Sequence, residues 1–301
     1  MSENIKKSAS TIFLESRTQL RSELSHSDVF QRFTDEENGL KRVTIDGTTY
    51  LIAEGDLLLD EDELLLYANQ RATQNRERES QNLLASAGMG FLGITDLRGL
   101  IGVTDGSGKI VRWAEGLKLT YCVLKQTFTS DQRYNTVKEN MKLATQDWSV
   151  TCGVQFEYLE ALDDSPGLNR AGVIFTVREI DARGAFIASA FFPNDPPSRR
   201  RVLVDGSYFD PSLRFNRVGV LRHELGHVLG FRHEHIRSGA PPACQGEPLG
   251  GDTPLTEYDP QSVMHYFCGG RGSAELAITE LDRIGSQQVY GPSFGRFTFV
   301  Q

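Results

Sequence analysis

Apolar residues recur at spacings of three and four in the middle of the chain, which is the period of one helix face. They are Tyr134, Val137, Met141, Ala144 and Trp148. Ser130 precedes them, and its hydroxyl can accept a hydrogen bond from the first helical turn. We therefore predict a helix that begins just after Ser130.

Short apolar runs rich in β-branched and aromatic residues predict strands around that helix. They are Leu117 to Leu124, Val154 to Tyr158, Val173 to Val177, Ile187 to Phe192 and Val202 to Val204. A second helix is expected from about Asn216 to Leu229. Strands with an interposed helix favour an α/β sheet of partly parallel order.

The amino-terminal third follows a different pattern. Val43 to Ala53 places β-branched residues on both sides of Asp46-Gly47, which predicts a hairpin, and the acids from Asp60 to Glu63 precede a leucine-rich short helix. Residues 69–80 are polar and 86–108 are glycine-rich, as in a linker. We expect an amino-terminal segment at 1–70, a linker at 71–110 and the main domain at 111–301.

Composition narrows the classes of function. The net charge is −8 and the pI is about 5.4, which argues against nucleic-acid partners because phosphate binding needs clustered Lys and Arg. No apolar stretch approaches the roughly 20 residues of a membrane span. No apolar signal core is visible within the first 20 residues. The oligomeric state cannot be read from the sequence.

The cysteines have no metal-site spacing. They are Cys122, Cys152, Cys244 and Cys268. Two disulfides or buried reduced thiols are both compatible with the sequence. For the disulfides, Cys122 would pair with Cys152 on neighbouring strands, and Cys244 with Cys268.

Two histidines four residues apart lie in the second predicted helix. His223 and His227 fall on one helix face, so both imidazoles can reach one ion. Gly230 can end the helix by adopting a left-handed conformation, and His233 can then return to the same ion. We predict a zinc site on these three histidines. A chance match to five specified residues in eleven positions, the three histidines with Glu224 and Gly230, is expected in about one chain of this size in 100,000.

Three nitrogen ligands leave a fourth position open, which is typical of catalytic zinc. Water in that position can be deprotonated near neutral pH and attack a polarised carbonyl. Glu224, beside the first ligand, can take the proton and pass it to the leaving amine. The motif therefore predicts hydrolysis.

The string His223-Glu-x-x-His227-x-x-Gly230-x-x-His233 resembles the metzincin clan of zinc peptidases, and the following Glu234 is similar to the astacin family within it. The segment from Tyr258 to Tyr266 also resembles the astacin Met-turn, apart from Pro260. This resemblance implies an α/β (α+β) catalytic domain with a mixed, mostly parallel five-stranded sheet. It also implies an active-site helix, a Met-turn and an amino-terminal prosegment.

The same resemblance implies roles for further residues. Met264 would form a hydrophobic floor under the metal without binding it, and Tyr266 would be a displaceable fifth ligand that stabilises the oxyanion. Glu234 would hold a new amino terminus after processing. His235 and His265 lie nearby in sequence, and ordinary hydrogen bonding is the favoured interpretation for them.

Ala53-Glu-Gly55-Asp56-Leu57 is similar to the astacin propeptide motif, although Ala53 replaces its phenylalanine. The resemblance implies that Asp56 occupies the water position of the zinc and keeps the enzyme latent. The alternative is an acid in an ordinary Gly-Asp turn. If the enzyme is latent, residues 75–78 in the polar linker are a candidate cleavage region.

We therefore predict an astacin-like zinc endopeptidase. Extended peptide substrates would add to an antiparallel edge strand. That edge comprises Ile187, Ala188, Ser189, Ala190, Phe191 and Phe192. The alternatives are a peptidase of another metzincin branch and a non-catalytic zinc protein that binds peptides. Family habit and the cysteine count favour secretion.

Overall fold

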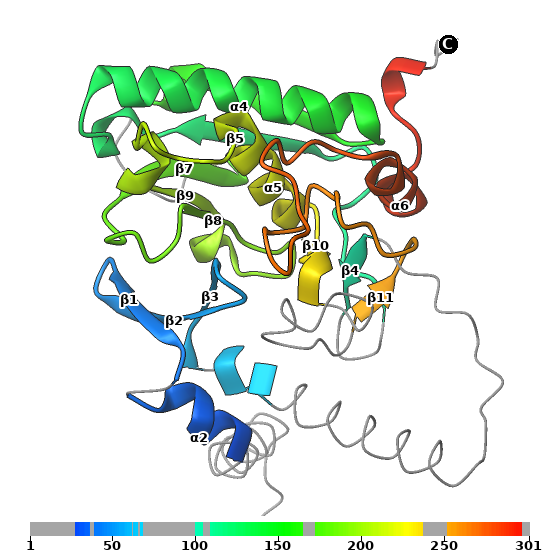
Figure 1. Ribbon diagram of the computed structural model, residues 1–301. Helices are drawn as coiled ribbons and strands as arrows, with labels where there is room; N and C mark the ends of the chain where they lie inside the picture. Colours follow the sequence, from blue (N-terminus) through cyan, green and yellow to red (C-terminus); the bar gives the residue numbers. More distant parts are fainter. Residues whose placement is uncertain are drawn as a thin grey trace, which may run out of the picture. The chain divides into compact units, whose positions relative to one another are not determined.

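The computed structural model describes residues 28–36, 39–61, 63–65, 67–68, 100–104, 109–164, 172–236 and 252–296. The chain divides into two compact units (Figure 1). One comprises residues 1–53 and 58–91, and the other comprises residues 54–57 and 92–301. The four-residue stretch Glu54–Leu57 thus belongs to the larger unit, although the residues on both sides of it belong to the smaller one.

A β-hairpin forms the described centre of the smaller unit. β1 (Lys41–Ile45) pairs antiparallel with β2 (Thr48–Ala53), with Ile45 opposite Thr48. Asp46 and Gly47 form the two-residue turn with φ values of 52° and 79°, the left-handed pair that a type I′ turn requires. The predicted hairpin is confirmed.

Short elements surround this hairpin. β3 (Leu57–Leu59) joins β2 as a third strand, and α2 (Asp28–Thr34) carries Phe30 into a small apolar cluster with Leu51 and Leu64. Residues 61, 63–65, 67 and 68 are helical, as the acid-then-leucine pattern predicts. Asp60 and Glu63 each accept a hydrogen bond from the other's backbone N–H at 3.0 Å, which caps this helix.

The larger unit is built on a five-stranded sheet. Its strand order is β6 (Gln155–Tyr158), β5 (Lys118–Val123), β7 (Phe175–Ile180), β9 (Arg201–Asp205) and β8 (Ala188–Ser189). The first four strands are parallel, and β8 runs antiparallel to β9 at the edge. The structure therefore confirms a mixed α/β fold with a mostly parallel five-stranded sheet.

Two long helices pack against each other in this unit. α4 (Asp131–Thr151) begins where predicted, since the Ser130 side chain accepts a hydrogen bond from Arg133 N at 3.2 Å. All five residues of the predicted apolar face are buried, and Thr145 is buried with them. α4 contacts α5 (Arg217–Val228), and both lie in the main core (Figure 1).

A second, small sheet holds the chain just beyond α5. β4 (Ile101–Val103) lies between β10 (Phe231–Arg232) and β11 (Asp252–Pro254), and both pairings are antiparallel. β4 falls inside the stretch 71–110 that the sequence suggested as a linker. Its three residues have no periodic pattern, so only pairing with distant residues makes them a strand.

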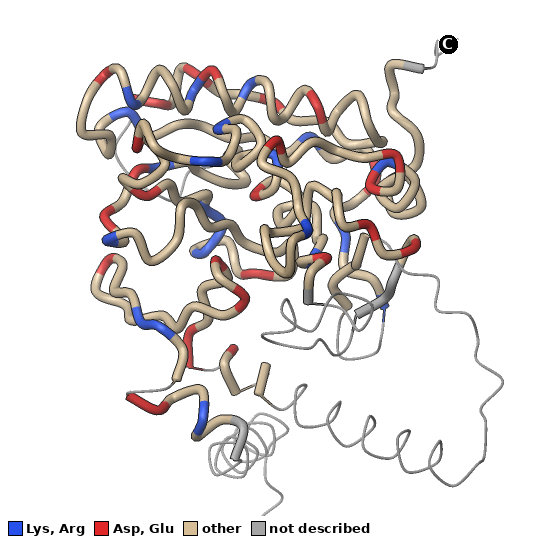
Figure 2. Tube along the Cα trace, in the orientation of Figure 1, with Lys and Arg blue, Asp and Glu red and all other residues tan. Residues whose placement is uncertain are grey.

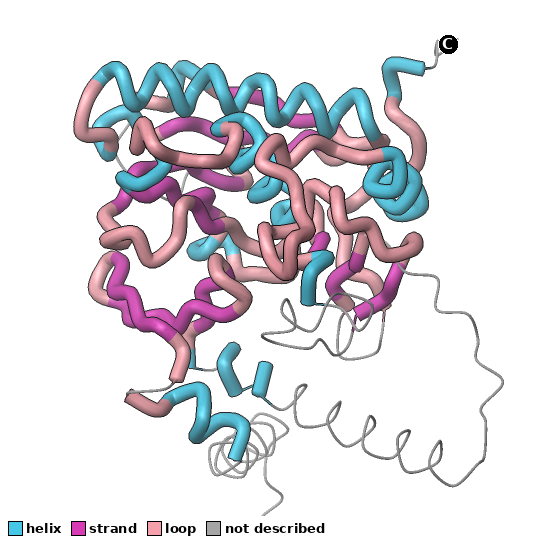
Figure 3. The backbone as a smooth tube through the Cα atoms, in the orientation of Figure 1, coloured by secondary structure: helices cyan, strands magenta, loops and turns pink. Residues whose placement is uncertain are grey.

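The last helix and the short 3-10 turns complete the fold (Figure 3). α6 (Glu280–Tyr290) starts with a capping box between Thr279 and Asp282. The 3-10 turns are η1 (Lys125–Thr127), η2 (Glu160–Leu162), η3 (Pro197–Arg199), η4 (Gly206–Phe209), η5 (Glu234–Ile236) and η7 (Phe294–Arg296).

The edge strand is shorter than the sequence indicated. Only Ala188 and Ser189 of the run Ile187 to Phe192 pair with β9. Asp195 accepts a hydrogen bond from Phe192 N at 2.9 Å and turns the chain, and Phe191 is buried in the core. The position at an antiparallel edge is as expected, but the length of the strand was wrong.

The predicted disulfide between Cys122 and Cys152 is wrong. Both side chains are buried thiols and are not joined to each other. Cys152 lies at the end of α4, where its sulfur is 3.8 Å from Trp148 O. The other predicted pair includes Cys244, which lies outside the described residues.

Charged residues of both signs are interspersed along α4 (Figure 2). Lys138 pairs with Glu160 at 3.1 Å, and Lys142 pairs with Glu139 at 3.0 Å. In the part of the chain described here, no helix is long and apolar enough to cross a membrane.

Candidate metal centre and active site

α5 presents two histidines and a glutamate on its buried face. Asn216 caps the helix by accepting a hydrogen bond from Gly219 N at 3.0 Å. His223 and His227 follow one turn apart, and Glu224 lies beside the first of them. All three side chains are at most 2% exposed, so their polar atoms face the protein interior.

The chain reverses immediately after α5 and brings in a third histidine. Gly230 has a φ of 90°, and a Cβ on it would lie 2.8 Å from Val111 O, so both conformation and space require glycine. β10 then pairs with β4, with Phe231 opposite Gly102. This pairing fixes the backbone that leads to His233.

The outer nitrogen of each imidazole faces an acceptor. His223 Nδ1 lies 2.7 Å from Val263 O, and His227 Nδ1 lies 2.7 Å from Phe231 O. His233 Nδ1 lies 3.1 Å from the Glu54 carboxylate. Because carbonyl and carboxylate oxygens only accept, each Nδ1 must carry the proton.

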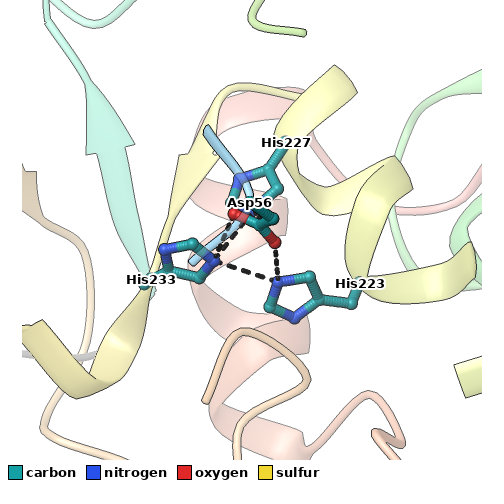
Figure 4. Close-up of side chains that lie close together, drawn as sticks. All are labelled: Asp56, His223, His227 and His233. Atoms are coloured by element: carbon teal, nitrogen blue, oxygen red, sulfur yellow. Dashed lines mark hydrogen bonds and ion pairs between the residues drawn. The ribbon is translucent and has the colours of Figure 1, made fainter. Parts of the chain in front are cut away.

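The inner nitrogens face one another and are the atoms placed to bind a metal ion. His223 Nε2 and His227 Nε2 each lie 3.1 Å from His233 Nε2. One ligand atom from each histidine and one from Asp56 lie within 4.8 Å of one another (Figure 4). This donor set fits a cation such as zinc, which binds imidazole and carboxylate ligands.

The electrostatic environment of this cluster also favours a cation. Burial lowers the pKa of His227 to about 4, which keeps it in the neutral form that ligates metals. Burial acts in the same direction on His233, but the carboxylates of Asp56 and Glu54 outweigh it and raise its pKa to about 9. The position between His233 and the carboxylates is thus one where positive charge is stabilised.

Asp56 reaches the histidine cluster from the turn between β2 and β3. Its carboxylate lies 3.4 Å from His223 Nε2, 3.7 Å from His227 Nε2 and 3.2 Å from His233 Nε2. Burial opposes ionisation, yet the neighbouring imidazoles lower the pKa of Asp56 well below its usual value. Its Oδ1 accepts no hydrogen bond from any described residue, which leaves a lone pair for a metal ion.

Glu224 lies in a different electrostatic setting. Burial, followed by the Asp56 carboxylate, raises the pKa of Glu224 well above its usual value. Its Oε2 is buried and is not hydrogen-bonded to any residue that the structure describes. Both causes disfavour the charged form of Glu224.

The loop from Asp259 to Tyr266 closes the site beneath α5. A Cβ added to Gly226 would lie 2.3 Å from Met264 Sδ, so Met264 contacts the metal-binding helix directly. Ser262 Oγ donates to Asp282 Oδ1 at 2.6 Å, and Val263 N donates to Asp282 Oδ2 at 2.8 Å. This anchoring fixes the Val263 carbonyl that orients His223.

Tyr266 lies between the histidines and Asp56. Its ring stacks on His223 with the centroids 4.9 Å apart, and its hydroxyl donates to Asp56. Gly55 lies beside it with a φ of 102°, and a Cβ there would lie 3.2 Å from the Tyr266 ring. The hydroxyl is therefore available to an oxygen in the place that Asp56 occupies.

The other histidines and Glu234 support the loops. Glu234 N donates to Met264 O at 2.8 Å, and Glu234 Oε1 accepts from Asp259 N at 2.8 Å. His265 lies between Tyr258 OH and the Tyr266 carbonyl, at 2.8 and 2.6 Å. His235 packs against the His233 ring at 4.9 Å. Neither His235 nor His265 contributes to the metal-binding group.

A pocket of about 470 Å³ opens beside His223 and Glu224. Its apolar lining comprises Phe186, Ile187, Ala188, Phe215, Val220, Phe267 and Leu276. Arg214, Asp56 and Tyr266 also line it. The pocket thus adjoins both the edge strand β8 and the catalytic candidates.

Sequence reasoning missed three contributors to this site. They are Glu54, Arg232 and the pocket residue Arg214. Glu54 forms an ion pair with Arg232 although the two lie 178 positions apart, so no local pattern connects them. Glu54 lies two residues before Asp56, and this spacing of two acids was the one signal in the sequence that could have indicated a role for Glu54.

Comparison with known proteins gives one family match. The model of the matrixin family matches residues 112–240, which include the three histidines and Glu224 but less than half of the chain. This match supports a zinc peptidase of the metzincin type. It does not favour the astacin family over another branch of that clan.

No curated protein matches the chain. Among solved structures, one titled "Structure of Myroilysin" is similar at 18% identity and a TM-score of 0.40. The match covers 60% of this chain and 82% of that one. A likeness of this degree supports no statement about function.

Proposed function

We propose that this chain is a zinc endopeptidase of the astacin type and that the intact form is latent. The observation that carries the proposal is the convergence of three imidazole Nε2 lone pairs beside a buried glutamate and an apolar pocket. His223, His227 and His233 would hold the zinc ion. Bound zinc supplies Lewis-acid chemistry, which polarises a peptide carbonyl and acidifies water.

The protein's own residues divide the remaining work. Glu224 takes a proton from the attacking water and returns it to the leaving amine. Tyr266 donates its hydroxyl to the developing oxyanion, in the place where it now donates to Asp56. The substrate lies extended along β8, with one side chain in the adjoining pocket.

The proposal of the astacin type rests on Glu234 and on the loop that Glu234 binds. Glu234 is buried and bonded to the loop that carries Met264 and Tyr266, which is the surround that the family resemblance implies. A metzincin of another branch is the alternative. Sequencing the amino terminus of the activated protein, together with Glu234→Gln in the Asp56→Ala background, tests this: a loss of activity after processing but not before it supports the astacin type.

Latency follows from the position of Asp56. Its carboxylate fills the space between the three Nε2 atoms and Tyr266, where an attacking water would have to stand. Asp56→Ala in the intact chain should raise basal peptide cleavage, whereas the exposed control Asp164→Ala should not. Equal activity of both variants contradicts latency. The candidate cleavage region at 75–78 lies outside the described residues.

The decisive test separates an enzyme from a zinc protein that only binds peptides. Glu224→Ala should keep its zinc, measured by elemental analysis, and lose peptide cleavage in the Asp56→Ala background. The matched control is Glu115→Ala, which changes an exposed acid of the same unit. If zinc-loaded Asp56→Ala protein cuts no peptide in a diverse library, the non-catalytic alternative is correct.

Secretion is also a proposal, and it rests on the family resemblance. The cysteine count supports it less than expected, because Cys122 and Cys152 are thiols. The intact mass of the natural protein and its location in a fractionated culture would decide the matter.

A further inference from the structure

Two carboxylates flank Gly55 in the turn between β2 and β3, and both reach the same histidine. Asp56 Oδ1 lies 3.2 Å from His233 Nε2, while Glu54 Oε2 lies 3.1 Å from His233 Nδ1. The imidazole is therefore held between two acids of one short segment, Glu54–Leu57, which we call the inserted segment. Asp56 contacts this imidazole only on its metal-facing side, and Glu54 contacts the opposite side.

Glu54 also pairs with the residue that precedes His233. Its Oε1 accepts from Arg232 Nη2, and both side chains are buried, at 0% and 8% exposure. Glu54 and Arg232 thus form a buried ion pair. Glu54 therefore binds two consecutive residues, Arg232 and His233, at once.

The backbone conformation of Glu54 indicates that its side chain has a role in this turn. Glu54 has a φ of 55°, a left-handed conformation that is unfavourable for a non-glycine residue. Glycine would form this turn more easily, as Gly55 does at a φ of 102°. A glutamate persists here at that cost while its carboxylate is fully paired.

We propose that Glu54 is a positioning residue of the latent metal site: it fixes His233 through Nδ1 and clamps the inserted segment to Arg232. A carboxylate on Nδ1 sets the ligating tautomer and raises the basicity of Nε2, so zinc binds more tightly. The inference rests on the metal site of the proposed function. It adds that the closed form holds zinc more tightly than a form without Glu54.

The test uses the full chain in a Glu224→Ala background, so that no self-cleavage occurs. Glu54→Gln keeps the shape but loses the charge, and Glu54→Gly relieves the backbone while removing the carboxylate. Zinc transfer to a chromophoric chelator gives the affinity and the release rate. We expect a loss of about 10- to 100-fold in zinc affinity for both variants and none for Glu115→Gln.

A second readout distinguishes positioning from general destabilisation. Cobalt(II) replaces zinc, and its visible absorption reports the geometry of the ligands. Glu54→Gln should change this spectrum at a temperature where circular dichroism shows an unchanged fold. The inference is overturned if Glu54→Gly keeps both the wild-type zinc affinity and the wild-type cobalt spectrum, because Glu54 would then be a turn residue only.

Failure of the proposed function would give a different result. A protein that binds zinc but cuts no peptide would refute the endopeptidase and leave the comparison of Glu54 variants intact. Conversely, if the activated enzyme cleaves peptides normally and the zinc affinity of the Glu54→Gln variant is unchanged, only the positioning role is refuted.

Discussion

Gly226 and Met264 are in direct contact across the base of the metal site. A Cβ on Gly226 would stand 2.3 Å from Met264 Sδ and 3.5 Å from the Trp148 ring. All of these groups are fully buried, so neither partner can move toward solvent. The spacing of α5 over the Met264 loop is therefore set by the lack of a side chain at position 226.

The first prediction follows from this contact. Gly226→Ala should destabilise the protein by about 1–3 kcal/mol through overpacking, although alanine favours helix by about 1 kcal/mol. Chemical denaturation measures the change. In the double variant with Met264→Ala, the two effects should be strongly non-additive, because the second substitution removes the clashing sulfur. Additive effects would show that the contact does not limit the helix.

Metal removal gives the second prediction. A cation bound to the folded cluster of Asp56, His223, His227 and His233 stabilises the folded state, so the zinc-free protein should melt at a lower temperature. Adding zinc at 100 times its Kd should restore about 2.7 kcal/mol. Calorimetry at increasing zinc concentration measures this, with magnesium as the control because it prefers oxygen ligands. Equal stabilisation by magnesium would argue against a nitrogen-rich site.

Substrate preference supplies the third prediction. The pocket beside Glu224 is lined mainly by apolar side chains and has a volume of about 470 Å³. A large apolar residue next to the scissile bond should be favoured, since its burial contributes about 1.5–3 kcal/mol. Val220→Phe should shift cleavage toward smaller residues by about tenfold in kcat/KM, measured with a peptide library. The exposed substitution Val150→Phe on α4 is the matched control.

The buried thiols give the fourth prediction, which concerns pH. Burial raises the pKa of Cys152 to about 12, so the fraction of reactive thiolate stays small even at pH 10. Alkylation of Cys122 and Cys152 should be slow in the folded protein at pH 8 and at pH 10, and fast in denaturant. Peptide mass spectrometry reads out both sites. A recovered Cys122–Cys152 disulfide would contradict the structure.

Features set by neighbours in sequence were predictable. The apolar face of α4, its Ser130 cap and the Asp46-Gly47 turn depend on residues within a few positions of one another. The histidine spacing on α5 belongs to the same class, since a helix brings positions four apart together. These local rules also indicated which side chains could meet at the metal.

Features set by distant residues were not predictable in the same way. β4 is a strand only because Gly102 pairs with Phe231 and Thr253. The edge strand ends early because the Asp195 carboxylate binds Phe192 N. Burial of Cys122 and Cys152 gives no spacing signal that separates a thiol from a disulfide. Pairing of this kind depends on tertiary contacts that a single sequence does not reveal.

The inserted segment is a loop and not a free end, because the chain continues into the smaller unit on both sides of residues 54–57. A cut near residues 75–78 would remove the covalent tether without severing the loop itself. Under the proposed latency, inhibition then becomes bimolecular. Its strength would depend on the concentration of the fragment, whereas in the intact chain it depends on effective molarity. Processed protein should thus gain activity on dilution, and the released fragment should act as an inhibitor in trans.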